Sequence, residues 1–353
     1  MRLLDVTRLI RRGRRTPTGI DRVERAYLRY LLDLPDDVAG LIRTRLGYVI
    51  LGRAGLMAVA KDPDLTTARH HAFVRCVPIG LGPVLRRLRP DVYINVGHSN
   101  LTARVCRAVR RAGGRVVVVV HDTIPLDTPH LQRPQTHARF ARFLAQAARA
   151  DAIVVPSHQT RLALLRHVAV PPPIHVAPLG LEPFAAVRPV SVPMPFVLML
   201  GTIEPRKNLD LMLDVWAANA HRPDWPHLVV CGARGWAGAA TVARLDAAPA
   251  RVHATGPLPQ DQVAWLLASA RALVFPSLAE GYGLPPQEAA AYGTPVLCAD
   301  LPVLRETLGP RAQFLPTDDP MAWAQAVAEP LPRMAPHHGP KWHDHFKIVL
   351  KII

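Results

Sequence analysis

Five consecutive valines, Val116–Val120, constrain the fold of this chain more than any other segment. A strand that is apolar on both faces must be covered on both faces, as are the strands of a parallel sheet between two helical layers. Strand-like segments alternate with helical patterns from end to end of the 353 residues. Such alternation predicts doubly wound parallel sheets.

Two blocks of this alternation predict an α/β protein with two Rossmann-like domains that face each other across a cleft. The proline-rich stretch 171–195 interrupts both patterns, because proline neither continues a helix nor donates a hydrogen bond to a sheet. We therefore expect one domain at 1–180, a second at 181–335, and a helix within 336–353 that packs back on the first. Strands are expected at 3–7, 91–96, 115–121, 152–156, 196–201, 227–232, 252–255, 273–276 and 296–299.

The net charge of +16 comes almost entirely from arginine, since only five residues are lysine. A basic surface attracts nucleic acid, anionic lipid headgroups or phosphorylated substrates, and composition does not choose among them. No apolar run has the length of a membrane span and the first residues lack the pattern of a secretory signal, so we expect a cytoplasmic protein. The cysteines lie far apart, which favours reduced core thiols over a disulfide framework or a zinc site: Cys76, Cys106, Cys231 and Cys298.

The segment 275–289 gives the strongest functional signal in the chain. Its pattern predicts a strand, a turn containing glycine and then a helix. Gly281 and Gly283 let the backbone approach a ligand, and the free N–H groups at the start of the helix suit a phosphate. Because a carboxylate beside a phosphate would repel it, Glu280 and Glu288 are better suited to accept hydrogen bonds from the hydroxyls of a sugar and of a nucleotide ribose. A structural alternative is an ordinary Rossmann-like turn with a capping acid.

This stretch resembles the Glu-x7-Glu signature of retaining glycosyltransferases of the GT-B fold, glycosyltransferase family 4, and the flanking segment 293–296 also fits. The resemblance implies that Glu280 contacts the donor sugar and Glu288 the ribose. The second domain would then bind the nucleotide sugar, and the first would lie on the acceptor side. The resemblance also implies that backbone N–H groups of the turn bind the donor diphosphate, namely those of Gly281, Tyr282, Gly283 and Leu284.

A second motif, at 201–208, follows the first strand of the second domain. Adjacent cations at a strand–helix junction can neutralise a diphosphate leaving group. The resemblance implies that Gly201, Arg206 and Lys207 line the donor site. The chain departs from many relatives in having Thr202 where they have arginine, and Arg206 is the residue that could substitute. The alternative is a solvated charge pair in a loop.

A third motif, His121-Asp122-Thr123-Ile124-Pro125, ends the valine-rich strand of the first domain. It resembles the His-Asp-x-Ile-Pro element of the family, whose histidine faces the donor sugar near its reacting carbon. A histidine after a strand has a structural role more often than a catalytic one. The role of His121 is therefore an implication of the resemblance.

Other polar segments have simpler interpretations. Gly19, in a basic loop that opens a helix, could let that loop approach the donor phosphates or the acceptor, and a loop without ligand is the alternative. Asp21 favours the helix start, and Ser157 is predicted to cap a helix. Asp62-Pro63-Asp64 is interpreted as a turn, and the histidines at 337, 338, 343 and 345 lack the carboxylate partners of a metal site.

The resemblance as a whole implies a metal-independent hexosyltransferase that retains the configuration at the transferred carbon, with a GDP- or UDP-linked donor as substrate and no cofactor. GDP-mannose is the favoured donor, a glycan or lipid-linked molecule the expected acceptor, and peripheral contact with anionic membrane at the inner face of the plasma membrane a hypothesis. Alternatives are a catalytically inactive partner subunit, a phosphorylase or a nucleotide-sugar epimerase. A basic nucleic-acid-binding protein is disfavoured, because the arginines are not interleaved with aromatic residues in a known binding module.

Overall fold

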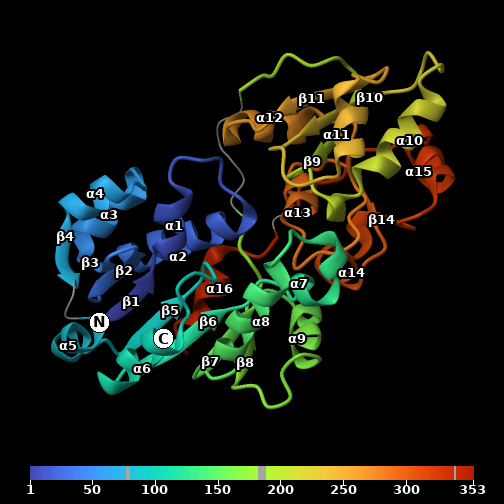
Figure 1. The fold of residues 1–353 in the computed structure, drawn as a ribbon. Coiled ribbons are helices and arrows are strands. Elements are labelled where there is room, and N and C mark those ends of the chain that lie inside the picture. Colours follow the sequence, from blue (N-terminus) through green and yellow to red (C-terminus); the bar gives the residue numbers. More distant parts are fainter. Residues whose placement is uncertain (77–79, 182–187, 338) are drawn as a thin grey trace.

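The computed structural model describes residues 1–76, 80–181, 188–337 and 339–353, which form two α/β lobes (Figure 1). The N-terminal lobe is built on an eight-stranded sheet in the order β4-β3-β2-β1-β5-β6-β7-β8. The strands from β2 to β8 in this order pair in parallel with their neighbours, whereas β3 runs antiparallel to both β2 and β4. The strands are Arg2–Asp5 (β1), Val38–Thr44 (β2), Gly47–Leu51 (β3), Ala72–Cys76 (β4), Val92–Asn95 (β5), Arg115–Val119 (β6), Ala152–Val155 (β7) and Ile174–Val176 (β8).

Helices cover both faces of this sheet, as the valine run requires. Val117 and Val119 of β6 face one core, and Val116 and Val118 face the other. The first core is covered by α1 (Thr7–Arg12), α2 (Gly19–Asp33), α3 (Arg53–Lys61), α4 (Leu65–His70) and the C-terminal α16 (Trp342–Val349). The second is covered by α5 (Leu81–Leu88), α6 (Ala103–Arg111), α8 (Thr136–Ala147) and α9 (His158–Leu165), and a short helix α7 (Ile124–Asp127) precedes α8.

The C-terminal helix α16 packs on the N-terminal lobe. The Phe346 ring stacks on that of Tyr30 with 3.8 Å between centroids, and its edge meets Tyr27. His345 lies buried beside them, where its Nε2 is 2.8 Å from the Tyr27 hydroxyl oxygen and its Nδ1 is 3.1 Å from the Ala177 carbonyl oxygen. The chain therefore crosses between the lobes twice.

The C-terminal lobe is built on a six-stranded, all-parallel sheet in the order β11-β10-β9-β12-β13-β14. Its strands are Phe196–Leu200 (β9), His227–Cys231 (β10), Val252–Gly256 (β11), Ala272–Phe275 (β12), Val296–Ala299 (β13) and Ala312–Leu315 (β14). One face is covered by α10 (Leu209–Asn219), α11 (Ala239–Asp246) and α15 (Pro320–Ala328), and the other by α12 (Gln260–Ser269), α13 (Leu284–Ala291) and α14 (Pro302–Leu308).

Each sheet reverses its strand order at one point. Successive strands run outward from β9 in one direction and from β12 in the other, so the reversal lies between β9 and β12; in the N-terminal lobe it lies between β1 and β5. Open α/β sheets bind ligands beyond the carboxyl ends of the strands at such a reversal, because the flanking loops diverge there and leave a crevice. The residues that follow β1, β5, β9 and β12 are therefore the candidates for a ligand-binding site.

The predicted fold class is confirmed, since two α/β lobes with predominantly parallel sheets face each other. The prediction that both sheets are parallel needs one correction: strands β2, β3 and β4 form an antiparallel extension at one edge of the first sheet. No strand was expected in that region. All nine strands that the sequence predicts are present, within a few residues of their expected ends.

Three further predictions can be compared with the described residues. Cys106, Cys231 and Cys298 are buried free thiols, as expected, whereas the side chain of Cys76 lies outside the described residues. Within the described ranges, no helix combines the length and apolarity that crossing a bilayer needs, and no three His, Cys, Asp or Glu side chains form a group that could hold a metal ion. Asp62 instead pairs with Arg14, and Asp64 caps α4. His338 also lies outside the described part of the chain.

Candidate active site

The turns that follow β9 and β12 lie side by side at the strand-order reversal of the C-terminal lobe. After β9, a short 3-10 helix at Pro205–Lys207 ends at Asn208, which has a left-handed backbone with φ of 56°. The Asn208 side chain donates to the Pro276 carbonyl oxygen at 3.2 Å, and the Leu278 N–H donates to the Arg206 carbonyl oxygen at 2.8 Å. These bonds fix the two predicted motifs against each other.

A largely buried cluster of charges joins the two turns. Glu280 Oε1 lies 2.7 Å from Lys207 Nζ and 2.8 Å from Arg206 Nη1. Arg206 also pairs with Glu204, so two cations and two carboxylates neutralise one another. Lys207 Nζ is also 4.3 Å from the centroid of the Phe275 ring, a cation–π contact that helps to hold the ammonium in place.

The cluster shifts the pKa values of its members in opposite directions. Burial alone would raise the pKa of Glu280, but the charges of Arg206 and Lys207 lower it to about 2. Burial lowers the pKa of Lys207 from its ordinary value, against the opposing effect of Glu280. Despite its burial, the pKa of Arg206 is raised by Glu280 and Glu204. At neutral pH Glu280 is therefore a carboxylate and Arg206 a cation.

The turn between β12 and α13 has the backbone of an anion-binding site. Gly283 caps α13 in a left-handed conformation with φ of 82°. Pro285 and Pro286 have no N–H, so the backbone donors of this turn are the N–H groups of residues 281–284, to which the positive end of the helix dipole adds. Tyr282 turns its side chain away into the core of the N-terminal lobe, where its hydroxyl donates to the Leu179 carbonyl oxygen at 3.1 Å.

His121 approaches this site from the N-terminal lobe. A side chain on Gly281 would collide with the His121 carbonyl oxygen, so the two turns are in close contact. His121 Nε2 is 2.9 Å from the Val96 carbonyl oxygen, and because a carbonyl only accepts, this nitrogen bears the ring proton. Burial lowers the pKa of His121 to about 4, so the ring is neutral near pH 7.

Asp122, the next residue, faces the charge cluster of the other lobe. Burial raises its pKa to about 6, and the charge of Arg206 opposes that rise. One carboxylate oxygen accepts from the Ile124 N–H at 3.1 Å, which holds the start of α7 in place. The His-Asp motif therefore supplies a neutral imidazole and a carboxyl group at the boundary between the lobes.

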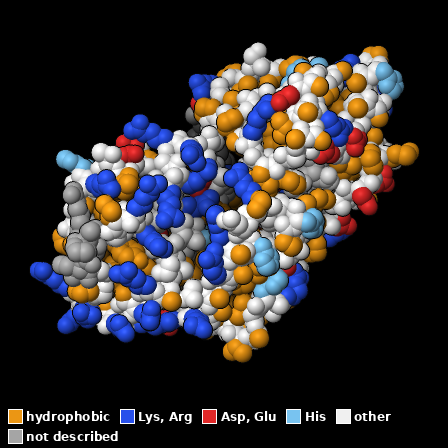
Figure 2. Space-filling model, in the orientation of Figure 1, with side chains coloured by type: hydrophobic (Ala, Val, Ile, Leu, Met, Phe, Trp, Pro, Cys, Tyr) orange, Lys and Arg blue, Asp and Glu red, His pale blue; other side chains and the backbone are white. Residues whose placement is uncertain are grey.

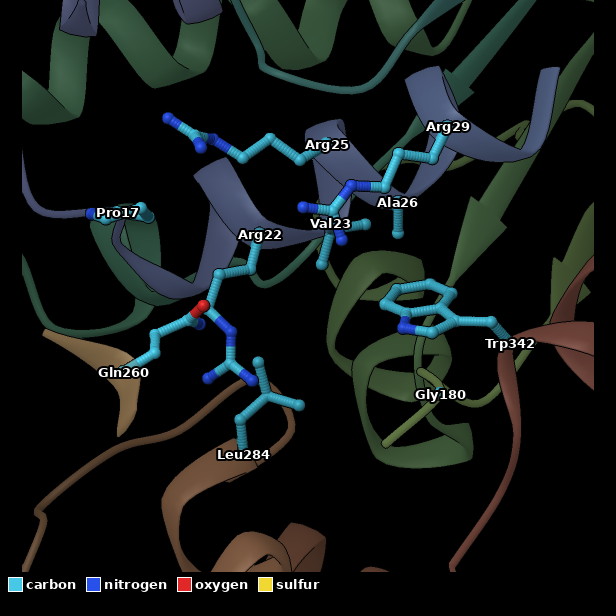
Figure 3. A pocket seen from close by; sticks show the side chains of 10 residues that line it. All are labelled: Pro17, Arg22, Val23, Arg25, Ala26, Arg29, Gly180, Gln260, Leu284 and Trp342. Carbon is cyan, nitrogen blue, oxygen red and sulfur yellow. The ribbon is translucent and has the colours of Figure 1, made fainter. Parts of the chain in front are cut away.

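Helix α2 contributes another contact between the lobes. Thr18 and Asp21 form a capping box at its start, and Gly19 lies beside the Leu284 side chain of α13. One turn further on, Arg22 forms an ion pair with Glu288. Arg22 reaches between Gln260 and Leu284, in a pocket that α16 closes with Trp342 (Figure 3).

The structure thus brings most of the predicted site residues together. Glu280, Arg206 and Lys207 are in direct contact, and Gly201 lies against the Lys207 side chain. Glu288 lies apart from that cluster, on α13, where it meets Arg22. Ser157 caps α9, as predicted, and its hydroxyl also donates to the Gly281 carbonyl oxygen at 3.3 Å.

Sequence reasoning missed several polar residues of this region. Glu204 and Asp122 lie inside two of the predicted motifs, and only the ion pair of Glu204 with Arg206 and the effect of the Arg206 charge on the pKa of Asp122 identify them. At the strand-order reversal of the N-terminal lobe, Asp5 accepts from Tyr93 at 2.8 Å and Asn100 at 2.7 Å. The signal that could have found Asp5 is its position at the end of the first strand, next to a reversal that only the topology reveals.

Comparison with known proteins agrees with this arrangement. The family model described as Glycosyltransferase Family 4 matches residues 58–183, and that described as Glycosyl transferases group 1 matches residues 194–331. The serotype-specific mannosyltransferase WbdA of Escherichia coli is 28% identical over an alignment of 247 residues, and the match covers 63% of this chain and 30% of that protein. The O-antigen chain mannosyltransferase B of Escherichia coli is 33% identical over 118 residues, or 32% of this chain and 31% of that protein.

These alignments span about a third of each of the two relatives' own length. Among solved structures, Alr3699/HepE of Anabaena in complex with UDP-glucose superposes with a TM-score of 0.64 at 15% identity, covering 93% of this chain and 88% of that one. The lobes and their facing strand ends therefore define the GT-B fold. Together, the two family models and the mannosyltransferase relatives support a glycosyltransferase of this fold.

Proposed function

We propose that this protein transfers a sugar from a nucleotide-sugar donor to a glycan or lipid-linked acceptor, with retention of configuration. The observation that supports this most is the buried cluster of Arg206, Lys207 and Glu280 beside the uncapped start of α13. It combines cations for a diphosphate, N–H groups for its oxygens and a carboxylate for a sugar hydroxyl. All three lie at the strand-order reversal where α/β sheets bind nucleotides.

The donor would exchange partners with the charge cluster. Without donor, Glu280 and Glu204 neutralise the two cations. A diphosphate would attract Arg206 and Lys207 toward its oxygens and release part of the Glu280 carboxylate for the sugar hydroxyls. Because Arg206 and Lys207 supply positive charge that stabilises the negative charge developing on the leaving diphosphate, the proposal includes no metal ion.

In the transfer step, the bond between the anomeric carbon and the diphosphate breaks while the acceptor oxygen approaches from the same face. The leaving phosphate takes the proton of the acceptor hydroxyl, so Glu280 and Glu288 position the donor and do not act as an acid–base pair. A retaining glycosidase, by contrast, needs two carboxyl groups about 5 Å apart across the bond. His121, neutral and with its proton on Nε2, would offer the region near its Nδ1 to the transferred sugar.

GDP-mannose is the proposed donor, and growth of a surface polysaccharide the proposed process. The support comes from the relatives named as mannosyltransferases, among them one named for the O-antigen chain. A lipid-linked acceptor would bring the protein into peripheral contact with an anionic membrane. The arginine-rich surface suits that contact.

The first test is a thermal-shift panel of GDP-mannose, UDP-glucose, UDP-N-acetylglucosamine and dTDP-rhamnose. A ligand at about 100 times its Kd adds about 2.7 kcal/mol to the free energy of unfolding and raises the midpoint by a few degrees. We expect GDP-mannose to stabilise the wild type and the exposed control Glu329→Gln, but not Glu288→Gln or Lys207→Ala. If no nucleotide sugar stabilises the protein while unrelated polyanions do, the donor site is wrong.

A second test addresses catalysis itself. Incubation of the protein with a stabilising donor and a lipid-linked glycan should yield a product enlarged by one hexose, with the anomeric configuration of the donor by NMR. Donor binding without transfer to any glycan would instead favour the catalytically inactive partner subunit.

A further inference from the structure

Two histidines face each other beyond the ends of neighbouring strands in the N-terminal lobe. Strands β5 and β6 pair in parallel, and His98 and His121 occupy the same register position beyond their last pair. His98 Nε2 lies 3.0 Å from the Val119 carbonyl oxygen at the end of β6. His121 Nε2 lies 2.9 Å from the Val96 carbonyl oxygen, directly after β5. Each ring therefore bonds to the strand that carries the other.

The two reciprocal bonds give both rings the same protonation. A carbonyl oxygen only accepts a hydrogen bond, so Nε2 bears the proton and Nδ1 keeps its lone pair in each ring. Burial and the neighbouring His121 lower the pKa of His98 well below its ordinary value, so this ring is neutral at pH 7, like that of His121. Among the described residues, neither Nδ1 has a hydrogen-bond partner, and neither is fully enclosed in the protein. Both Nδ1 atoms are therefore open to a ligand.

Aromatic contacts hold the two rings in place. Their centroids are 5.0 Å apart, with 39° between the ring planes. His98 also stacks on Phe143 of α8, with 4.1 Å between centroids, and meets the ring of Phe140 edge-on at 5.9 Å. Because these contacts restrict the side-chain torsions of His98, the side chain loses little conformational entropy when it binds a ligand.

Buried polar side chains hold loop 97–100, which carries His98, from beneath. Asn95 Nδ2 donates to a carbonyl oxygen of the loop at 2.6 Å, and Asn100 Nδ2 donates to the Asp5 carboxylate at 2.7 Å. His98 and Asn100 both have left-handed backbones, with φ of 58° and 63°, which residues other than glycine rarely adopt. Such a conformation costs free energy, and the buried bonds keep the loop in it. The fold thus fixes His98 in one orientation at the strand-order reversal of the N-terminal lobe.

The position of His98 associates it with the acceptor rather than with the donor. His121 contacts the Gly281 turn of the other lobe, beside the candidate donor site. Within the described ranges, the ring contacts and the hydrogen bond of His98 come from its own lobe alone. In a reactive complex the two reacting atoms lie about 3–3.5 Å apart. Rings whose centroids are 5.0 Å apart can therefore each meet a hydroxyl of a different sugar.

We propose that His98 is a second histidine of the active site, whose Nδ1 accepts a hydrogen bond from an acceptor hydroxyl next to the one that reacts. The proposal rests on the proposed function, which places the donor sugar beside His121. Figure 2 shows the surface hollowed along the boundary between the lobes, which gives an acceptor a way in. His98 moves no proton in this role, since the reacting hydroxyl still passes its proton to the leaving phosphate. It fixes which hydroxyl of the acceptor faces the donor.

The opposing explanation is that His98 only satisfies the carbonyl oxygen of Val119. Two amide variants separate this explanation from the proposal. Asparagine places its amide where Nδ1 of the imidazole lies, and it tolerates a left-handed backbone. Glutamine places its amide where Nε2 lies. His98→Asn therefore keeps a polar group for the acceptor, whereas His98→Gln keeps the bond to Val119.

The assay uses GDP-mannose as donor and, as acceptors, the octyl glycosides of mannose, glucose, N-acetylglucosamine and rhamnose. Loss of one neutral hydrogen bond should raise the acceptor KM of His98→Gln about tenfold, whereas that of His98→Asn should stay within about twofold of the wild type. The KM for GDP-mannose and the thermal shift that GDP-mannose causes should not change in either variant. His137→Gln, exposed on α8 of the same lobe, is the matched control and should behave like the wild type.

The opposite order, with the acceptor KM raised in His98→Asn and unchanged in His98→Gln, would show that His98 only holds the strand end and would overturn the proposal. So would a smaller GDP-mannose shift in His98→Gln, which would place His98 against the donor. A wild type that transfers to no glycoside contradicts the proposed function. Transfer with the same acceptor KM in the wild type and both variants contradicts only the role of His98.

A spectroscopic measurement tests the rings without any acceptor. In NMR spectra of the protein with isotope-labelled histidine, a protonated ring nitrogen resonates apart from an unprotonated one, and the signals missing in His98→Asn identify His98. We expect the proton of His98 on Nε2 in the ligand-free protein, and we expect the Nδ1 signal to move when an octyl glycoside that serves as acceptor is added. A proton on Nδ1 of the ligand-free protein would contradict the proposal.

Discussion

At the scale of single residues, the candidate site is a set of charges that depend on one another. Glu280 is ionised only because Arg206 and Lys207 contact it, and burial lowers the pKa of Lys207 against the opposing charge of Glu280. Leaving one member of a buried ion pair without its partner costs more than the pair contributes when intact. The cluster should therefore respond strongly to a substitution that changes charge but not shape.

Glu280→Gln should lower the stability of the ligand-free protein by about 3 kcal/mol, because two buried cations lose a counter-charge. Addition of GDP should then raise the melting temperature of the variant more than that of the wild type, since a diphosphate replaces the lost negative charge. Differential scanning fluorimetry with and without GDP measures both effects, with Glu329→Gln as the exposed control. An unchanged melting temperature without ligand would contradict the dependence of the cations on Glu280.

A second buried acid, Glu24 of α2, predicts a dependence of stability on pH. Burial and the nearby charge of Asp5 raise its pKa from 4.5 to about 8, although Arg8 opposes the shift and Asp21 adds to it. The folded protein therefore holds a proton that the unfolded chain releases, and the stability contributed by that proton is lost as the pH rises from 4.5 to about 8.

Glu24→Gln removes this titration while keeping the shape of the side chain. The stability of the variant relative to the wild type should therefore grow between pH 5 and pH 8, by at most about 1.4 kcal/mol per pH unit. Urea unfolding at several pH values measures the difference, and Asp33→Asn, exposed on the same helix, should show none. A constant difference across this range would mean that Glu24 ionises as freely in the folded as in the unfolded state.

At the scale of elements, sequence patterns predicted the strands that are buried on both faces, but they missed the antiparallel strands at the edge of the first sheet. Strands such as β6 and β9 are apolar on both faces and end at glycine or polar residues, so their periodicity identifies them. Strands β2 and β3 form an antiparallel pair at the sheet's edge, and a run as short as that of β3 is compatible with helix or strand. The sequence predicted the turns of the C-terminal lobe but not the residues of the N-terminal lobe that lie against them. Arg22 reaches Glu288, and Asp122 lies near Arg206, only through tertiary packing.

The turn between β12 and α13 illustrates how closely two elements approach. A Cβ atom on Gly281 would collide with the His121 carbonyl oxygen and would lie 2.8 Å from Asp122 Cβ. Gly281→Ala should therefore separate the two turns and lower turnover at least tenfold in the transfer assay, because the histidine and the donor site would no longer align. Gly238→Ala is the matched control, since a Cβ atom there meets nothing within 4 Å. Full activity of Gly281→Ala would show that the turns can move apart without consequence.

At the scale of the whole molecule, the lobes are held together by polar contacts at the carboxyl ends of their strands. Arg22 pairs with Glu288, Thr160 donates to the Gly281 carbonyl oxygen at 2.9 Å, and Trp236 donates to the Leu131 carbonyl oxygen at 3.1 Å. Each of these three contacts is a single hydrogen bond or ion pair. The lobes can therefore separate at moderate cost, which a site enclosed between them requires for exchange of substrate and product.

A further polar contact between the lobes can be tested without touching the candidate site. The Glu306 carboxylate, on α14, accepts from the N–H groups of His158 and Gln159 at 2.7 and 2.9 Å, so it caps α9 from the opposite lobe and meets the positive end of its dipole. Glu306→Gln removes that charge and should shift the equilibrium toward the open form by about 1 kcal/mol, or about fivefold. Small-angle X-ray scattering should show a larger radius of gyration, and kcat/KM should fall by a similar factor while GDP still raises the melting temperature. Glu329→Gln is the exposed control. If the variant keeps the wild-type radius and activity, the lobes are closed by the apolar contacts of Tyr282 and α16 alone, and the polar contacts only set their register.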